Sequence, residues 1–224
     1  MNDRGYSIEE YLKLKEGLTK NIKYASNFSK ENLEEYKILL SKFKNSIVQK
    51  NNYKGKCLEE LVCFMFTNLD LFEIHKNIYT STNEIDQLVA LSDLGKLFKS
   101  DGQIDIKSNY ILCECKNYSK KVDVTWVGKF CNLLEEQPAR IGIIFSYYGF
   151  KGRGNWDSAK GLCKKFYYRK EKYDEKMYVI DFNIDDFDKI ADGISFLDIL
   201  SSKVESLEID TKYEHFISKH PAQQ

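Results

Sequence analysis

Proline, long apolar runs and net charge are all scarce in this chain of 224 residues. Only 2 prolines occur, which excludes long proline-rich linkers. No apolar run approaches the ~20 residues that a membrane-spanning helix needs, and the first residues are too polar for a signal peptide. We therefore expect a cytoplasmic protein with no membrane partner. Hydrophobic residues at 42% and charged residues at 30% are typical of a folded globular chain.

The 6 cysteines lack the paired spacing that marks a zinc site. Such sites commonly show two clusters of closely spaced cysteines. Here only Cys113 and Cys115 are close, and they lie inside an apolar stretch. Because no secretion signal is visible, reduced thiols are expected rather than disulfides. The sequence predicts buried free cysteines.

Basic and acidic residues balance, with 34 of each. A zero net charge argues against a surface that is positive all over, as some nucleic-acid-binding proteins have. It leaves room for a local basic surface, which is what contacts with phosphates require.

Residues 7–50 are predicted to be helical. Ser7 and Glu10 form a capping-box pattern, and Ser29 can cap a second helix. An apolar stripe with spacings of three and four indicates packing on the chain's own domain rather than a dimer seam. The stripe consists of Leu33, Tyr36, Leu40, Phe43 and Ile47. Lys54 and Gly55 are interpreted as a break before a helix over 56–69.

The remainder alternates between strand and helix patterns. Strands are predicted at 72–79, 84–91, 110–116, 141–147 and 177–182, and a loop-rich stretch at 92–108. Helices are predicted at 122–136 and 156–170, with one or two more at 185–207. This order predicts an α/β fold in which helices flank a mixed central sheet. We divide the chain into a helical extension (1–50), a main domain (51–210) and a tail (211–224).

One strand carries an acid and a lysine among apolar residues. In residues 110–116 a period of two places Glu114 and Lys116 on one face and Cys115 on the other. Charges in a buried strand are costly unless they are paired or bind a metal. Asp86 interrupts another apolar strand in the same way, and a hairpin could return that strand beside Glu114. Asp105 is the alternative first acid, and a purely structural ion pair is the simplest alternative reading.

The order of Glu59 on a helix, Asp86 on a strand, Glu114-Cys115-Lys116 on a strand and then another helix resembles the PD-(D/E)xK nuclease superfamily. The sequence around Gly55–Glu59 and Glu114–Asn117 looks like its Mrr-like branch. The resemblance spans roughly residues 55–150, with Ile85 in place of the proline of the nominal motif. It implies a restriction-endonuclease-like fold with an N-terminal helical extension.

The resemblance also implies a mechanism. Asp86, Glu114 and the carbonyl of Cys115 would bind Mg²⁺ or Mn²⁺, which prefer hard oxygen ligands. Lys116 would orient the attacking water or stabilise the phosphate. The expected function is an Mg²⁺-dependent DNA endonuclease in restriction or anti-phage defence. An inactive nucleic-acid-binding or assembly subunit and an RNase remain alternatives, and a homodimer or a regulatory or sensor partner stays open.

Accessory residues are assigned by position. Glu59 lies at the margin of the apolar face of its helix, whereas Glu60 points nearly opposite and is expected to face solvent. Glu84 is an alternative accessory acid, but the favoured interpretation is that it is exposed. Contacts with nucleic acid are expected from Lys120, Lys121 and Arg153, the last in a glycine-rich loop that also reads as a plain surface turn.

Overall fold

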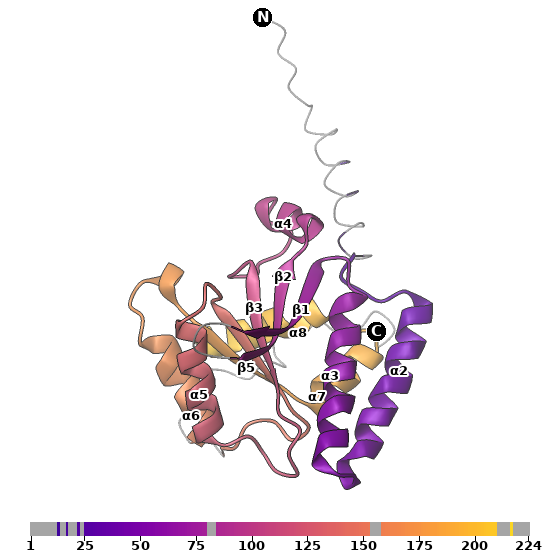
Figure 1. Ribbon diagram of the computed structural model, residues 1–224. Coiled ribbons are helices and arrows are strands. Elements are labelled where there is room, and N and C mark those ends of the chain that lie inside the picture. Colours follow the sequence, from indigo (N-terminus) through magenta and orange to yellow (C-terminus); the bar gives the residue numbers. More distant parts are fainter. Residues whose placement is uncertain are drawn as a thin grey trace, which may run out of the picture.

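A mixed sheet of 5 strands in the order β1-β2-β3-β4-β5 forms the centre of the computed structural model (Figure 1). The structure describes residues 25–79, 84–152 and 158–209, with residues 13, 17, 22 and 216. In chain order the strands are β1 (Phe72–Tyr79), β2 (Glu84–Leu91), β3 (Tyr110–Cys115), β4 (Ile141–Phe145) and β5 (Tyr178–Phe182). The first three strands pair antiparallel, and β3, β4 and β5 run parallel. The expected α/β class with a mixed, helix-flanked sheet is thereby confirmed.

Helices cover both faces of this sheet (Figure 1). They are α2 (Lys30–Asn45), α3 (Asn51–Thr67), α4 (Asp93–Ser100), α5 (Val124–Glu135), α6 (Ser158–Tyr168), α7 (Ile184–Ala191) and α8 (Phe196–Ile209), with 3-10 turns η1 (Ser46–Val48) and η2 (Tyr173–Glu175). Helices α5 and α6 lie over one face, and α2, α3, α7 and α8 over the other. Within the described residues, none of these helices has the length and apolarity needed to cross a membrane.

Helix α2 packs into the core, as its apolar stripe predicts. Ser29 caps the helix by accepting a hydrogen bond from the backbone nitrogen of Asn32. Tyr36, Leu40 and Phe43 are buried in the larger apolar core, between α2 and the sheet. The boundary drawn at residue 50 stays a prediction. The capping-box residues of the first helix and nearly all of the expected tail lie outside the described residues.

Two expectations for local structure are wrong. Lys54 and Gly55 do not break a helix but lie inside α3, because the extended backbone that separates two helices falls at Gln49 and Lys50. The stretch after β2 is not only loop, since α4 begins directly after Ser92, whose hydroxyl caps the helix at Gly95. In both places tertiary packing outweighs the weak local preference of glycine against helix.

The two faces of the sheet bury separate apolar clusters. Ile111, Cys113 and Cys115 of β3 point into the larger cluster with α2, α3, α7 and α8. Leu112 points into the smaller cluster under α5 and α6. This alternation follows the period of two of a strand and fixes which side chains share a face with Leu112. All 6 cysteines are free, as predicted, and only Cys63 is partly exposed rather than buried.

Candidate active site

Asp86, Glu114 and Lys116 converge at neighbouring ends of β2 and β3. The register pairs Gln87 with Cys113, which places Asp86 opposite Glu114 one residue further along. The ammonium of Lys116 forms an ion pair with Oε1 of Glu114 and lies 3.9 Å from Oδ2 of Asp86. The three side chains are 32%, 14% and 18% exposed respectively, so the cluster is partly shielded from water but open to a ligand.

The position of Asp86 is fixed by the backbone of the neighbouring strand. The amide of Cys115 donates a hydrogen bond to Oδ2 of Asp86 at 3.4 Å. The thiol of Cys115 meanwhile points into the opposite apolar cluster, as the alternation of β3 predicts. Burial, followed by the charges around it, raises the pKa of this thiol well above its ordinary value. Cys115 therefore contributes its backbone to the site and keeps an inert side chain outside it.

The cluster holds more negative than positive charge. Burial raises the pKa of Glu114 to about 7, the ammonium of Lys116 opposes the rise, and the carboxylate of Asp86 adds to it. Burial disfavours the charge on Lys116, but Glu114 and Asp86 outweigh that effect and raise its pKa. Lys116 thus stays charged between two acids that it only partly neutralises, which leaves the site suited to a further cation.

Trp126, at the start of α5, forms a wall of this site that the sequence did not single out. Nζ of Lys116 lies 5.0 Å from the centre of the indole ring, and Nζ of Lys129 lies 4.8 Å from it. Asp123 caps α5 through hydrogen bonds to the first backbone nitrogens and so fixes where Trp126 stands. The ring face attracts cations, which helps to hold the Lys116 side chain in one orientation.

The first turn of α3 is tied to the loop that follows β3. Lys54 is buried, and its ammonium donates a hydrogen bond to Oγ of Ser119 at 2.8 Å. In return Asn117 donates its side-chain amide to the carbonyl of Lys54 at 2.9 Å. The sequence did not predict these two contacts, because each joins segments more than 60 residues apart. These bonds fix the backbone immediately after Lys116.

Glu59 and Glu60 both line a groove that Asp86 also lines. Glu59 lies near Cys115, since its charge contributes to the raised pKa of that thiol. Glu60 is exposed, as expected, and it forms an ion pair of 2.5 Å with Lys42 of α2. Both acids therefore line the same groove, and Glu60 is paired with α2.

Other candidates fall into place by position. Asp105 is 79% exposed and pairs with Lys107. It precedes the start of β3, whereas Glu114 lies near the end of that strand, so Asp86 is the acid that meets Glu114. Lys120 and Lys121 are exposed on the loop after β3. That loop is joined to the segment after β4, because Lys151 donates its backbone N–H to the carbonyl of Val122 at 2.8 Å. Arg153 and the side chain of Glu84 lie outside what the structure describes.

The donor set of the cluster fits a hard divalent cation. Among the described residues, no three histidine, cysteine or acidic side chains gather closely enough to hold a metal by themselves. Mg²⁺ does not require such a cage, because it commonly binds through one or two carboxylates together with water and substrate phosphate. Asp86 and Glu114 offer that pair, and the charge balance around Lys116 favours an added cation.

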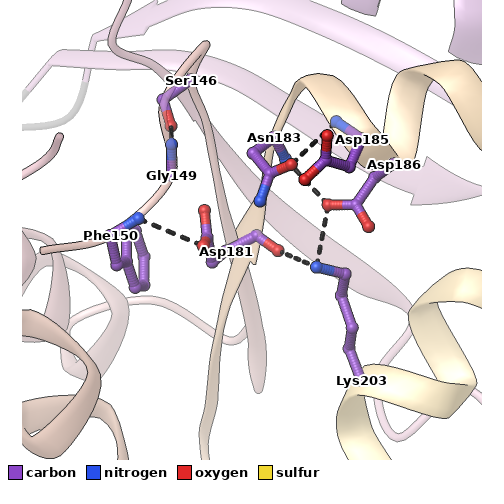
Figure 2. A network of polar contacts seen from close by, with 8 residues as sticks. All are labelled: Ser146, Gly149, Phe150, Asp181, Asn183, Asp185, Asp186 and Lys203. Atoms are coloured by element: carbon purple, nitrogen blue, oxygen red, sulfur yellow. Dashed lines mark hydrogen bonds and ion pairs between the residues drawn. The ribbon is translucent and has the colours of Figure 1, made fainter. Parts of the chain in front are cut away.

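A second polar network lies at the ends of β4 and β5 (Figure 2). Asp181 of β5 accepts a hydrogen bond from the backbone nitrogen of Phe150 at 3.1 Å, while its own carbonyl accepts one from Lys203 of α8 at 2.7 Å. Lys203 also forms an ion pair of 2.8 Å with Asp186, which is fully buried. Burial, only partly offset by Lys203, raises the pKa of Asp181. The network anchors the segment after β4, whose Phe150 bridges to Val122.

Comparison of the chain with family models, curated proteins and solved structures gives no match. The functional assignment therefore depends on the geometry of the chain's own residues.

Proposed function

We propose that this protein is an Mg²⁺-dependent nuclease with a restriction-endonuclease-like fold, whose active site consists of Asp86, Glu114 and Lys116. The observation that carries the proposal is the convergence of two carboxylates and one ammonium at adjacent strand ends, with Lys116 within 3.9 Å of Asp86 and paired with Glu114. Hydrolysis of a phosphodiester requires a large reduction of its barrier, and a divalent cation supplies charge neutralisation and activation of water.

The residues around the site have distinct tasks in this proposal. Asp86 and Glu114, with the carbonyl of Cys115, would hold the cation, and the Cys115 amide keeps Asp86 in place. Lys116, held by its acids and by the Trp126 ring, donates hydrogen bonds to the attacking water or to a phosphate oxygen. Glu59 approaches from the groove on the α3 side.

The substrate backbone would be held by lysines beside the site. Lys120 and Lys121 are exposed on the loop after β3, and Lys151 lies on the joined segment after β4. Local lysines are sufficient for phosphate contacts even when the net charge is zero, because such contacts are short-ranged in salt. Binding should therefore weaken steeply as salt rises.

The direct test is incubation of purified protein with plasmid DNA, single-stranded DNA and RNA, each with Mg²⁺ or EDTA. We expect cleavage only with Mg²⁺, and none from Lys116→Ala. Gln137→Met, a substitution beyond the end of α5, serves as the control and should retain full activity. If Lys116→Ala cleaves as fast as the wild type, the proposed site is wrong. Cleavage of RNA alone would assign the activity to ribonucleases on the same scaffold, and nucleic-acid binding without cleavage would support an inactive subunit.

A further inference from the structure

A groove of about 520 Å³ opens beside the proposed active site, between helices α2 and α3 and strands β1 and β2. Its volume falls within the range of about 300–1,000 Å³ that is usual for pockets that hold small molecules. Asp86 belongs both to this groove and to the catalytic cluster. A ligand that fills the groove therefore reaches the edge of the cluster at Asp86.

Most of the charged side chains that line the groove are acidic. Four carboxylates line it, against two lysines, and the acids are Glu35, Glu59, Glu60 and Asp86. Lys42 pairs with Glu60, and Lys116 lies 3.9 Å from Asp86, which leaves Glu35 and Glu59 as the acids that the groove offers to a ligand. Their carboxylates would attract a neutral group rich in N–H donors more than a phosphate. Its lysines, Lys56 and Lys76, are exposed, where they can meet the phosphates of a strand that enters.

The side-chain oxygen of Gln87 is a buried hydrogen-bond acceptor to which no described residue donates. The residue follows Asp86 on β2, lines the groove and is only 3% exposed. Within the described part of the chain, no donor reaches its amide oxygen. A buried polar atom without a partner costs about 1–3 kcal/mol, so a ligand that donates a hydrogen bond there would gain a correspondingly strong preference.

Apolar side chains complete the groove and select for shape. Phe64 of α3 and Leu39 of α2 also line it. Apolar walls do not contribute to binding a metal ion. They do favour a flat ring, because bases stack on aromatic side chains in many proteins that bind single strands. The ligand that satisfies both the walls and the acceptors is a flat heterocycle that carries N–H donors.

We infer that this groove receives one unpaired nucleobase with an exocyclic amino group, namely adenine, cytosine or guanine, next to the phosphate to be cleaved. The inference rests on the proposed nuclease activity and narrows its substrate to strands with an unpaired nucleotide at the cleavage point. Thymine and uracil lack the amino group, and their single N3–H donor stands between two carbonyl oxygens that the carboxylates would repel. A base within a duplex must first be extruded, at a cost of a few kcal/mol, so single strands, mismatches and branch points are preferred.

The inference is tested by binding, independently of cleavage. Fluorescence anisotropy with the Lys116→Ala protein and labelled strands of dA, dC or dT, each of equal length, measures the ratio of dissociation constants. We expect dA and dC strands to bind about five- to tenfold more tightly than dT, as one satisfied hydrogen bond allows. Adding Gln87→Met, which keeps the length of the side chain and removes the acceptor, should bring that ratio close to one. Adding Gln137→Met instead should preserve it.

Two further measurements keep the test decisive. Phe64→Leu, which keeps Gln87 but removes the aromatic wall, should weaken the binding of all three strands several-fold and leave their ratio unchanged. A blunt duplex of the same length should bind more weakly than its separate strands. Equal affinities for dA, dC and dT, or tighter binding of the duplex, would overturn the inference even if the protein cleaves DNA. A clear base preference without any Mg²⁺-dependent cleavage would overturn the proposed function but would support the groove as a binding site for a nucleobase.

Discussion

The backbone nitrogen of Cys115 donates a hydrogen bond to Oδ2 of Asp86 at 3.4 Å, so the first acid of the cluster is held by the strand that carries the second. This link makes Asp86 and Glu114 parts of one rigid unit rather than two side chains that meet by chance. Groups that act as a unit show non-additive effects when they are removed.

Asp86→Ala, Glu114→Ala and Lys116→Ala should each reduce Mg²⁺-dependent cleavage by at least about 100-fold, and the triple variant should lose little more than the worst single variant. Asp86→Asn separates charge from position, because the amide oxygen can still accept from Cys115. We expect it to be as inactive as Asp86→Ala but to unfold within a few degrees of the wild type. Initial rates and melting curves measure both. Additive losses across the series would show that the residues act independently.

Glu59→Gln should impair cleavage far more than Glu60→Gln. Glu59 is close enough to Cys115 for its charge to raise the pKa of that thiol, whereas Glu60 is paired with Lys42 of α2. Loss of that exposed ion pair should cost less than about 1 kcal/mol in stability. The two substitutions are chemically identical and lie one residue apart on α3, so each serves as the control of the other. Equal effects on the rate would contradict the different positions assigned to them.

The metal-free protein should lose stability as the pH rises from about 5 to about 7. The pKa of Glu114 is raised to about 7 in the folded chain and is 4.5 in its ordinary state. Between these values the folded state holds a proton that the unfolded state has released, so the stabilisation present at low pH disappears as the pH increases. We expect a decrease of about 1–3 kcal/mol, measured by melting in EDTA across this range. Glu114→Gln cannot titrate and should lack this decrease.

Mg²⁺ should raise the melting temperature of the wild type and should have little effect on Asp86→Ala/Glu114→Ala. A ligand bound only by the folded state stabilises that state. Ca²⁺ should produce a similar shift and support binding of nucleic acid, yet it should cleave poorly because it is larger and activates water less well. Melting curves with EDTA, Mg²⁺ or Ca²⁺ compare the two proteins. An equal shift in both would place the metal elsewhere.

Gly149→Ala should destabilise the fold more than Gly102→Ala. Both glycines have φ near +69°, a conformation that costs other residues roughly 1–2 kcal/mol. A Cβ at Gly102 meets open space, whereas one at Gly149 would lie 2.7 Å from Oδ2 of Asp181. We expect Gly102→Ala to lower the free energy of unfolding by about 1 kcal/mol and Gly149→Ala to lower it by several times as much, measured by urea unfolding. A similar loss at both positions would mean that the segment after β4 moves away from Asp181 at little cost.

The strands and the meeting of Glu114 with Lys116 could be predicted because their signals are local. A period of two fixes which residues of β3 share a face, and Glu114 and Lys116 lie on one strand. Helix α4 was missed because Gly95 resembles a turn residue. In the folded chain Gly95 is needed where α4 passes close to the carbonyl of Leu71, an approach that no side chain would permit.

The groove and the second network could not be predicted because their members come together only in three dimensions. Gln87 reads as a polar residue on an alternating strand, and only the position of α3 shows that it is buried. Asp181, Asp186 and Lys203 each fit a strand end or a helix surface when read alone. The contact of Trp126 with Lys116 likewise appears only in the folded chain, where the ring lies beside the lysine side chain.

The hydroxyl of Tyr36 donates a hydrogen bond to the carbonyl of Phe187 at 3.0 Å, across a separation of 151 residues. During synthesis, α2 therefore leaves the ribosome long before the helix that covers it. At about 5–20 residues per second, roughly 8–30 s pass before Phe187 is made. For about the second half of that interval, once β3 has been made, β1, β2 and β3 are available to pair, while the apolar side of α2 lacks part of its final cover. Acquisition of the native core is thus paced by translation of the last helices.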